Sequence, residues 1–239
     1  MTYNLFILNK EQSIKFCKLQ FLPLFAAIVL AMVLTYDKYS PLASVISFLI
    51  VYVYSYFAHI FAHYFPMQYL NLHLLLHHNH GFNTDTFNTV VNWFFEVGSN
   101  AIMFISFYVI KLIFNLTFIP DVLIFYYALI YISVHNINYT IFHADANHVI
   151  HHETKDSNCI WQTRNYGPDI LDHIFGTNGN DNFECSFHMI PNVLFAFLLS
   201  YYLFKHNNIV KFKDVFVIFL FYLTVFITFK ILNIKHLKT

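Results

Sequence analysis

Residues 41–63 read PLASVISFLIVYVYSYFAHIFAH, an apolar stretch that contains no Asp, Glu, Lys or Arg and ends on two histidines. A helix needs about 20 mainly apolar residues to cross a bilayer, so this stretch is long enough to span one. The charge-free sequence continues from residue 39 to residue 84, which is too long for a single crossing. The stretch therefore predicts a membrane helix that brings His59 and His63 to one membrane surface.

The composition of the whole chain favours a polytopic membrane protein. Of its 239 residues, 58% are hydrophobic and 11% are charged, whereas a soluble domain carries about 25% charged residues. The net charge is zero and Arg164 is the only arginine, so no nucleic-acid partner is expected. The three cysteines form no Cys-x-x-Cys pair, which argues against a disulfide scaffold.

Charge-poor runs predict where the chain crosses the membrane. We expect an all-α, polytopic membrane helix bundle with about four core helices and two C-terminal helices. The whole chain, residues 1–239, is treated as a single membrane domain. The six expected helices cover residues 20–36, 42–63, 96–118, 122–143, 189–204 and 214–232.

Short turns join the first helix to the second and the third to the fourth, so each pair is expected to form a hairpin. Two long polar stretches, 64–95 and 144–188, then lie on the same face of the membrane. Lys and Arg are more numerous on this face, which predicts that it is cytosolic. The segment 153–186 has an ordinary soluble composition and predicts a loop-rich cap with short helices.

The chain has 15 histidines, and most lie in or beside these two polar stretches. On a helix, side chains three or four residues apart share a face, so closely spaced histidines point together. Imidazoles from several segments are thus expected to converge at one membrane surface. The three clusters are His59 with His63, then His73 with His77 and His78, and finally His148 with His151 and His152.

Converging imidazoles are best explained by metal binding. Many buried imidazoles without a metal would compete for few hydrogen-bond partners. Eight clustered histidines exceed the four ligands that one zinc ion takes, so they indicate two ions. Imidazole suits iron, zinc, copper and nickel. The His-Glu-x-x-His motif of hydrolytic zinc enzymes does not occur in the sequence.

The boxes and the sequence that follows them resemble the fatty acid hydroxylase and sterol desaturase superfamily, whose members are integral-membrane, histidine-box di-iron oxygenases. After the third cluster the chain reads Asn165-Tyr166-Gly167 and then Asp172-His173-Ile174-Phe175-Gly176-Thr177, which is similar to the closing signature of that family. The resemblance covers a core of about residues 45–180. Glu96 also stands where members of the family often carry a glutamate.

The resemblance implies an O₂-dependent lipid hydroxylase or desaturase in a multi-pass membrane protein of the endoplasmic reticulum, if the source is eukaryotic. Its cofactors would be two iron ions and O₂, and its partners a bilayer lipid and an electron carrier such as cytochrome b5. The implied ligands are the eight clustered histidines together with His135. The second box is one residue longer than the family pattern, so His73 and His80 are alternatives there.

Several alternatives stay open on the sequence alone. His143 and His173 are further candidate ligands, and Asp172 and Asn165 are either hydrogen-bond partners of the ligands or parts of a turn. Iron and zinc are not distinguished, and neither is the lipid class nor the oligomeric state. A non-enzymatic membrane protein that binds or transports a metal is the alternative function, and a family member that has lost catalysis is another.

Overall fold

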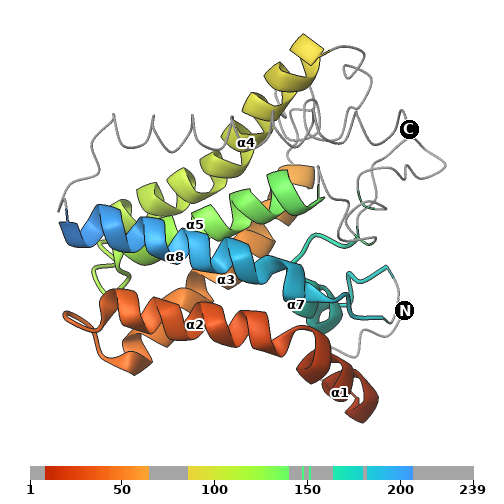
Figure 1. Ribbon diagram of the computed structural model, residues 1–239, viewed down its shortest axis with the longest axis horizontal. Coiled ribbons are helices and arrows are strands. Elements are labelled where there is room, and N and C mark those ends of the chain that lie inside the picture. The colour runs from red at the N-terminus through yellow and green to blue at the C-terminus, as the bar shows by residue number, and fades with distance from the viewer. Residues whose placement is uncertain are drawn as a thin grey trace.

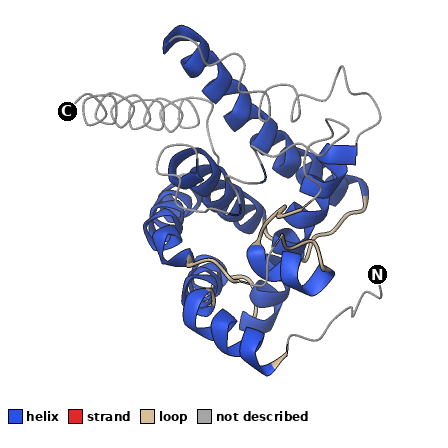
Figure 2. Cartoon of the chain, turned by 90° about the vertical axis from the view of Figure 1, so that its right-hand side faces the viewer, coloured by secondary structure: helices blue, strands red, loops and turns tan. Residues whose placement is uncertain are grey.

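The computed structural model describes residues 9–64, 86–139, 147, 151, 164–179 and 182–206, with side chains omitted at 86–93 and 205–206. Within these ranges the chain forms helices and loops and no strand (Figure 2). The all-α prediction is therefore confirmed for the described part of the chain. The expected sixth helix, residues 214–232, lies outside it.

In the described part of the chain, four helical segments are long and apolar enough to cross a membrane. They are α3 (Pro41–Tyr64), the apolar part of α4 (Thr86–Ile113), α5 (Asp121–Ser133) with its π-helical continuation η4 (Val134–Tyr139), and the segment built from η5 (Ser186–Met189), α8 (Ile190–Tyr201) and η6 (Tyr202–His206). These lengths and compositions fit a membrane protein.

The first expected helix is part of a bent pair. α1 (Lys10–Leu19) and α2 (Phe21–Thr35) meet at Gln20 with a bend of 60°. Together they are long and apolar enough to cross as one bent segment, which raises the number of candidate spans among the described residues to five. α1 has no buried residue and carries a capping box in which Asn9 and Gln12 bond to each other's backbone N–H groups.

The expected boundaries of the third helix, 96–118, were wrong at both ends, because α4 begins at Thr86 and ends at Ile113. Asn115 adopts a left-handed conformation with φ of 50°, a common way to end a helix. The N–H of Leu116 then bonds to the carbonyl of Lys111, and that of Asn115 bonds to the carbonyl of Leu112. The sequence did not predict this helix end, because asparagine is less common than glycine in the left-handed conformation that ends a helix.

α5 is the central helix of the bundle, since it packs against α2, α3, α4 and α8 (Figure 1). Leu123, Ile124 and Leu129 are buried on its different faces. Phe48 of α3 packs edge-on against Tyr127, with 5.5 Å between ring centroids. A helix that is apolar all round belongs in the interior of a bundle.

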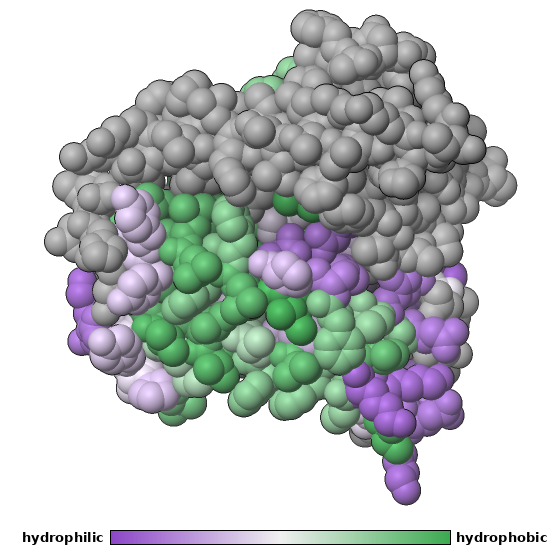
Figure 3. All heavy atoms as spheres, in the orientation of Figure 1, coloured by the Kyte–Doolittle hydropathy of each residue, from purple (hydrophilic) through white to green (hydrophobic). Residues whose placement is uncertain are grey.

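The two helical hairpins have their turns at the same end of the bundle. The Ser47 hydroxyl of α3 donates to the carbonyl of Phe118 at 3.0 Å, and Lys111 forms an ion pair with Asp121 at this end. At the opposite end the Gln20 amide donates to Asp169 at 3.0 Å, which joins the start of α2 to α7 (Asp169–Phe175). Figure 3 shows an apolar band between these two more polar ends. This arrangement agrees with the expected hairpins.

Candidate metal centre and the cavity beside it

Three histidines from two distant parts of the chain meet at the polar end of the bundle. His59 and His63 occupy the last turns of α3, one helical turn apart, and His151 lies against both. One ring nitrogen of each residue lies within 4.8 Å of those of the other two. His59 and His151 are fully buried. The structure thus brings together three of the predicted ligands from the first and third clusters.

Backbone carbonyls fix the orientation of two of these rings. The Nδ1 atom of His59 lies 2.5 Å from the carbonyl oxygen of Tyr166, and that of His151 lies 2.5 Å from the carbonyl oxygen of Arg164. A carbonyl oxygen only accepts, so Nδ1 must carry the proton and donate in both residues. The lone pair is therefore on Nε2 in each ring. Metal-binding histidines show this same arrangement, with one nitrogen held and the other available to the ion.

The loop that supplies these carbonyls is held by Asp172. Its carboxylate accepts from the N–H of Tyr166 at 3.0 Å, from the N–H of Gly167 at 2.6 Å and from the hydroxyl of Thr177 at 2.6 Å. Asp172 is buried in α7 and does not bond directly to a histidine among the contacts described. The sequence left open whether Asp172 bonds to a ligand histidine or belongs to a turn, and the structure supports the turn.

Asn165 has the same kind of role. It adopts a left-handed conformation with φ of 57°, which asparagine tolerates better than most residues. Its side-chain oxygen accepts from the N–H of Gly179 at 2.6 Å, and its own N–H donates to the carbonyl of Thr177 at 2.8 Å. A Cβ atom at Gly179 would lie 2.7 Å from the Asn165 amide nitrogen. A larger residue at position 179 would therefore require the Asn165 side chain to shift.

Sequence reasoning missed Tyr166 as a site residue. Its ring lies 5.6 Å from the ring of His59, 5.2 Å from that of His63 and 5.6 Å from that of His151, as distances between centroids. The aromatic ring thus packs against all three histidines while its carbonyl accepts from one of them. The Asn-Tyr-Gly motif was recognised as a family-like signature, but its spacing gave no sign that the tyrosine would reach the histidines.

Burial shifts the pKa values of His151 and Asp172, two groups outside the membrane helices. Burial lowers the pKa of His151 to about 4, although its hydrogen bond to Arg164 acts the other way. The ring is neutral at physiological pH, as a metal ligand must be. Burial raises the pKa of Asp172 to about 7, against the effect of the hydrogen bonds from Thr177 and Gly167.

His135 lies close to this group without belonging to it. Its ring is 6.2 Å from that of His59 and stacks on Tyr131 at 5.4 Å. It stands in the π-helix η4 and is buried. Single π-helical turns within α-helices occur frequently at functional sites. The predicted ninth ligand therefore stands beside the three-histidine group, on the wall of a cavity.

Other candidate residues lie elsewhere. His173 stacks on Phe183 and its Nδ1 donates to the carbonyl of Asp169 at 2.9 Å. Burial lowers the pKa of His173, but its hydrogen bonds to Asp169 and the charge of Asp169 outweigh this effect and raise it overall. Glu96 is buried within α4. The remaining candidates lie outside the described residues, and they are His73, His77, His78, His80, His143, His148 and His152.

The donor set of His59, His63 and His151 fits a divalent transition-metal ion. All three donors are imidazole nitrogens, the ligand type that iron and zinc accept. Metal–nitrogen bonds of about 2.1 Å place tetrahedral ligand nitrogens about 3.4 Å apart, so small rotations would bring these three rings into range. Three ligands leave room for further ligands or a substrate.

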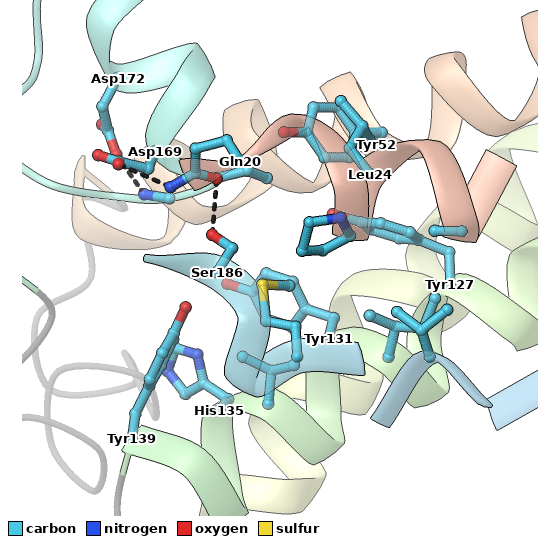
Figure 4. Close-up of a pocket in the computed structure, with 18 of the residues that line it drawn as sticks. Gln20, Leu24, Tyr52, Tyr127, Tyr131, His135, Tyr139, Asp169, Asp172 and Ser186 are labelled. Atoms are coloured by element: carbon cyan, nitrogen blue, oxygen red, sulfur yellow. Dashed lines mark hydrogen bonds between the residues drawn. The ribbon is translucent and has the colours of Figure 1, made fainter. Parts of the chain in front are cut away.

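A cavity of about 100 Å³ lies beside the histidines, among α2, α3, α5 and α8. Tyr166 and His135 line it and also pack against the three-histidine group. Figure 4 shows Gln20, Asp169 and Ser186 at one end of the cavity, and Leu24, Tyr52 and Tyr127 at the other. The cavity thus connects a polar end near the histidines with an apolar end inside the bundle.

A scan against protein-family models and searches of curated proteins and of solved structures gave no match to this chain.

Proposed function

We propose that this protein is a membrane-embedded oxygenase that hydroxylates or desaturates a lipid chain at a histidine-bound iron centre. The observation that carries the proposal is the convergence of His59, His63 and His151 beside a cavity that continues into the apolar bundle. A lipid needs such a route, because its chain must stay in apolar surroundings while one carbon reaches the metal.

The family resemblance supplies the chemical part of the proposal. Iron bound here would supply activation of O₂, with two electrons from a carrier of the cytochrome b5 type and two protons reducing one oxygen atom to water. In hydroxylation the other oxygen atom is inserted into a C–H bond of the lipid. In desaturation two hydrogens leave the chain, and both oxygen atoms leave as water. Nine histidines would hold two ions, with His135 on the cavity side.

The residues of the chain have three tasks in this reaction. The carbonyls of Arg164 and Tyr166 orient His151 and His59, so that both Nε2 atoms are available to the ion. The ring of Tyr166 covers the three imidazoles and helps to exclude water. The hydroxyl of Tyr131, 3.4 Å from Nδ1 of His59, adds a second polar contact on the cavity side.

Metal analysis combined with lipid profiling tests the proposal. The full-length protein, purified from a host grown with iron, should contain about two iron ions per chain. The host membranes should contain a hydroxylated or unsaturated lipid that is missing from cells without the protein. His151→Ala should abolish this product and lower the iron content, whereas His236→Ala, outside the three clusters, should leave both unchanged.

The outcome also distinguishes the alternatives. Iron binding without any new lipid would contradict the oxygenase proposal and favour a family member that has lost catalysis. Metal that crosses the membrane of sealed vesicles containing the protein would support transport instead. We expect no transport, because the described candidate ligands gather at one end of the bundle, whereas a transport path needs polar groups near the middle of the membrane.

A further inference from the structure

The apolar end of the cavity is closed by aromatic side chains. Phe48 lies edge-on against Tyr127, with 5.5 Å between ring centroids, and Tyr52 lies 5.8 Å from Tyr127. The Tyr127 hydroxyl lies 3.2 Å from the hydroxyl of Ser55. Phe48 is 1% exposed, so these rings form a packed floor rather than an opening. We call Phe48, Tyr52 and Tyr127 the aromatic floor.

The floor lies about one membrane leaflet away from the histidines. Phe48 precedes His59 by eleven residues on α3 and Tyr127 precedes His135 by eight, which correspond to about 16 Å and about 12 Å at 1.5 Å per residue. Half of the hydrocarbon core of a bilayer is about 15 Å thick. Two helices thus indicate that the cavity extends from the polar end to about the middle of the membrane.

The cavity is narrow for its depth. A volume of about 100 Å³ holds roughly seven to ten water-sized groups, since one such group needs about 10–15 Å³ by this measure. A methylene group is close to water in size. Spread over the depth between the histidines and the aromatic floor, this volume accommodates a single file of methylenes. A rigid system of several fused rings contains more carbon atoms than this volume holds.

The charged residues at the polar end of the cavity restrict which lipid head groups can bind there. Asp169 and Asp172 line the cavity there, and none of the described lining residues is Lys or Arg. Asp169 already accepts from the Gln20 amide at 3.0 Å and from the N–H of Glu184 at 2.9 Å, and its other carboxylate oxygen lies 3.5 Å from Nδ1 of His173. An anionic head group would meet the negative charge of the Asp169 carboxylate, which disfavours binding.

From this geometry we propose that the cavity binds one unbranched hydrocarbon chain under an uncharged head group, and that the aromatic floor limits the chain to roughly seven to ten methylenes beyond the histidines. This inference rests on the proposed function for its choice of a lipid ligand, and it names the substrate class. It favours a neutral lipid with an amide or hydroxyl head group over a sterol or a free fatty acid.

Photo-crosslinking of the full-length protein in lipid nanodiscs tests this inference without requiring turnover. The probes are primary fatty acid amides of increasing length with a terminal diazirine, and cross-linked peptides are identified by mass spectrometry. Probes whose ends reach the floor should label the peptides that contain Phe48 or Tyr127. Longer chains must displace packed rings, so labelling there should fall about 5- to 140-fold.

Three variants check that the floor sets the length limit. Phe48→Ala should move the limit to longer chains, and Ala27→Leu, at a small residue that lines the cavity, should move it to shorter ones. Phe25→Ala is the matched control, because Phe25 is 49% exposed on α2, and it should leave the limit unchanged. Two variants that shift the limit in opposite directions exclude a general loss of folding as the cause.

Competition experiments test the head group and chain type. A free fatty acid of the same length should compete about tenfold less well than the amide, and cholesterol should not compete at all. Equal competition by cholesterol, or a length limit that is the same in Phe48→Ala and the wild type, would overturn the inference. A length limit in a protein that makes no oxidised lipid would overturn only the proposed function, and oxidation without a limit would overturn only this inference.

Discussion

Replacing Asp172 with alanine tests whether the 164–167 loop positions the metal ligands. The substitution leaves three donors without their acceptor, namely the N–H groups of Tyr166 and Gly167 and the hydroxyl of Thr177. A hydrogen bond contributes about 1 kcal/mol, and one to a charged acceptor contributes more. We therefore expect the free energy of unfolding to fall by about 3–5 kcal/mol.

The same variant should also bind metal more weakly. The carbonyl of Tyr166 accepts from Nδ1 of His59, so a displaced loop no longer holds that ring. Loss of the groups that orient a ligand typically weakens metal binding 10- to 100-fold. Asp172→Asn should have a smaller effect on both measurements, because its one oxygen can still accept from Tyr166 and Thr177 and only the bond from Gly167 is lost.

Metal affinity is measured by competition with a chromophoric chelator, and stability by thermal unfolding in detergent with and without metal. Asp121→Ala is the control, because this aspartate is paired with Lys111 at the other end of the bundle. It should leave metal affinity unchanged. If Asp172→Ala unfolds more readily but binds metal as tightly as the wild type, the loop does not position the histidines and the reasoning is refuted.

Asp172 should also make the stability of the protein depend on pH. Its pKa is raised to about 7 by burial, so the folded state holds this proton more tightly than the unfolded state, and the carboxyl makes folding more favourable as the pH falls through 7. His151 has the opposite effect, because burial lowers its pKa to about 4. Its contribution to the free energy of unfolding is lost as the pH falls from 6.5 to 4, because the unfolded state takes up this proton first. Metal-free Asp172→Asn should therefore lose stability in acid more steeply than the wild type.

Three further predictions concern the loop and the topology. Gly179→Ala should destabilise the protein by about 1–3 kcal/mol, because its Cβ would clash with Asn165, whereas Gly98→Ala in α4, with nothing within 4 Å, should be neutral or stabilising in the same thermal assay. Cys17 and Cys185 are exposed at the polar end, so a membrane-impermeant thiol reagent should label both from the same side of sealed vesicles; labelling from opposite sides would contradict the arrangement. Gln20→Ala should increase protease cleavage near Cys185, since the Gln20 amide donates to the carbonyl of Glu184 at 2.7 Å, and unchanged cleavage would show that this contact does not hold the segment.

Much of the helical architecture could be predicted from the sequence because membrane crossing depends on local composition. Residues 42–63 were expected to form a helix, and α3 extends from Pro41 to Tyr64. A bilayer requires about 20 apolar residues in a row whatever the rest of the chain does. The end of α4 was predicted less well, because it depends on the backbone conformation of one residue, Asn115.

The histidine spacing likewise indicated which residues could share a face, since this follows from helical geometry alone. It correctly grouped His59 with His63. That His151 would join them, and that His135 would stand at the cavity wall, depended on the packing of α3, η4 and the 164–167 loop.

The sequence by itself determined that this chain is helical, apolar and rich in candidate metal ligands, because these properties belong to single residues and to neighbours along a helix. Only the tertiary structure decided that Tyr166 packs on three imidazoles, that backbone carbonyls orient two of them, and that Asp172 supports the loop between them. Contacts such as that between His59 and Tyr166 join residues 107 positions apart in the chain. Their geometry follows from how the helices pack against each other, which no local pattern of residues specifies.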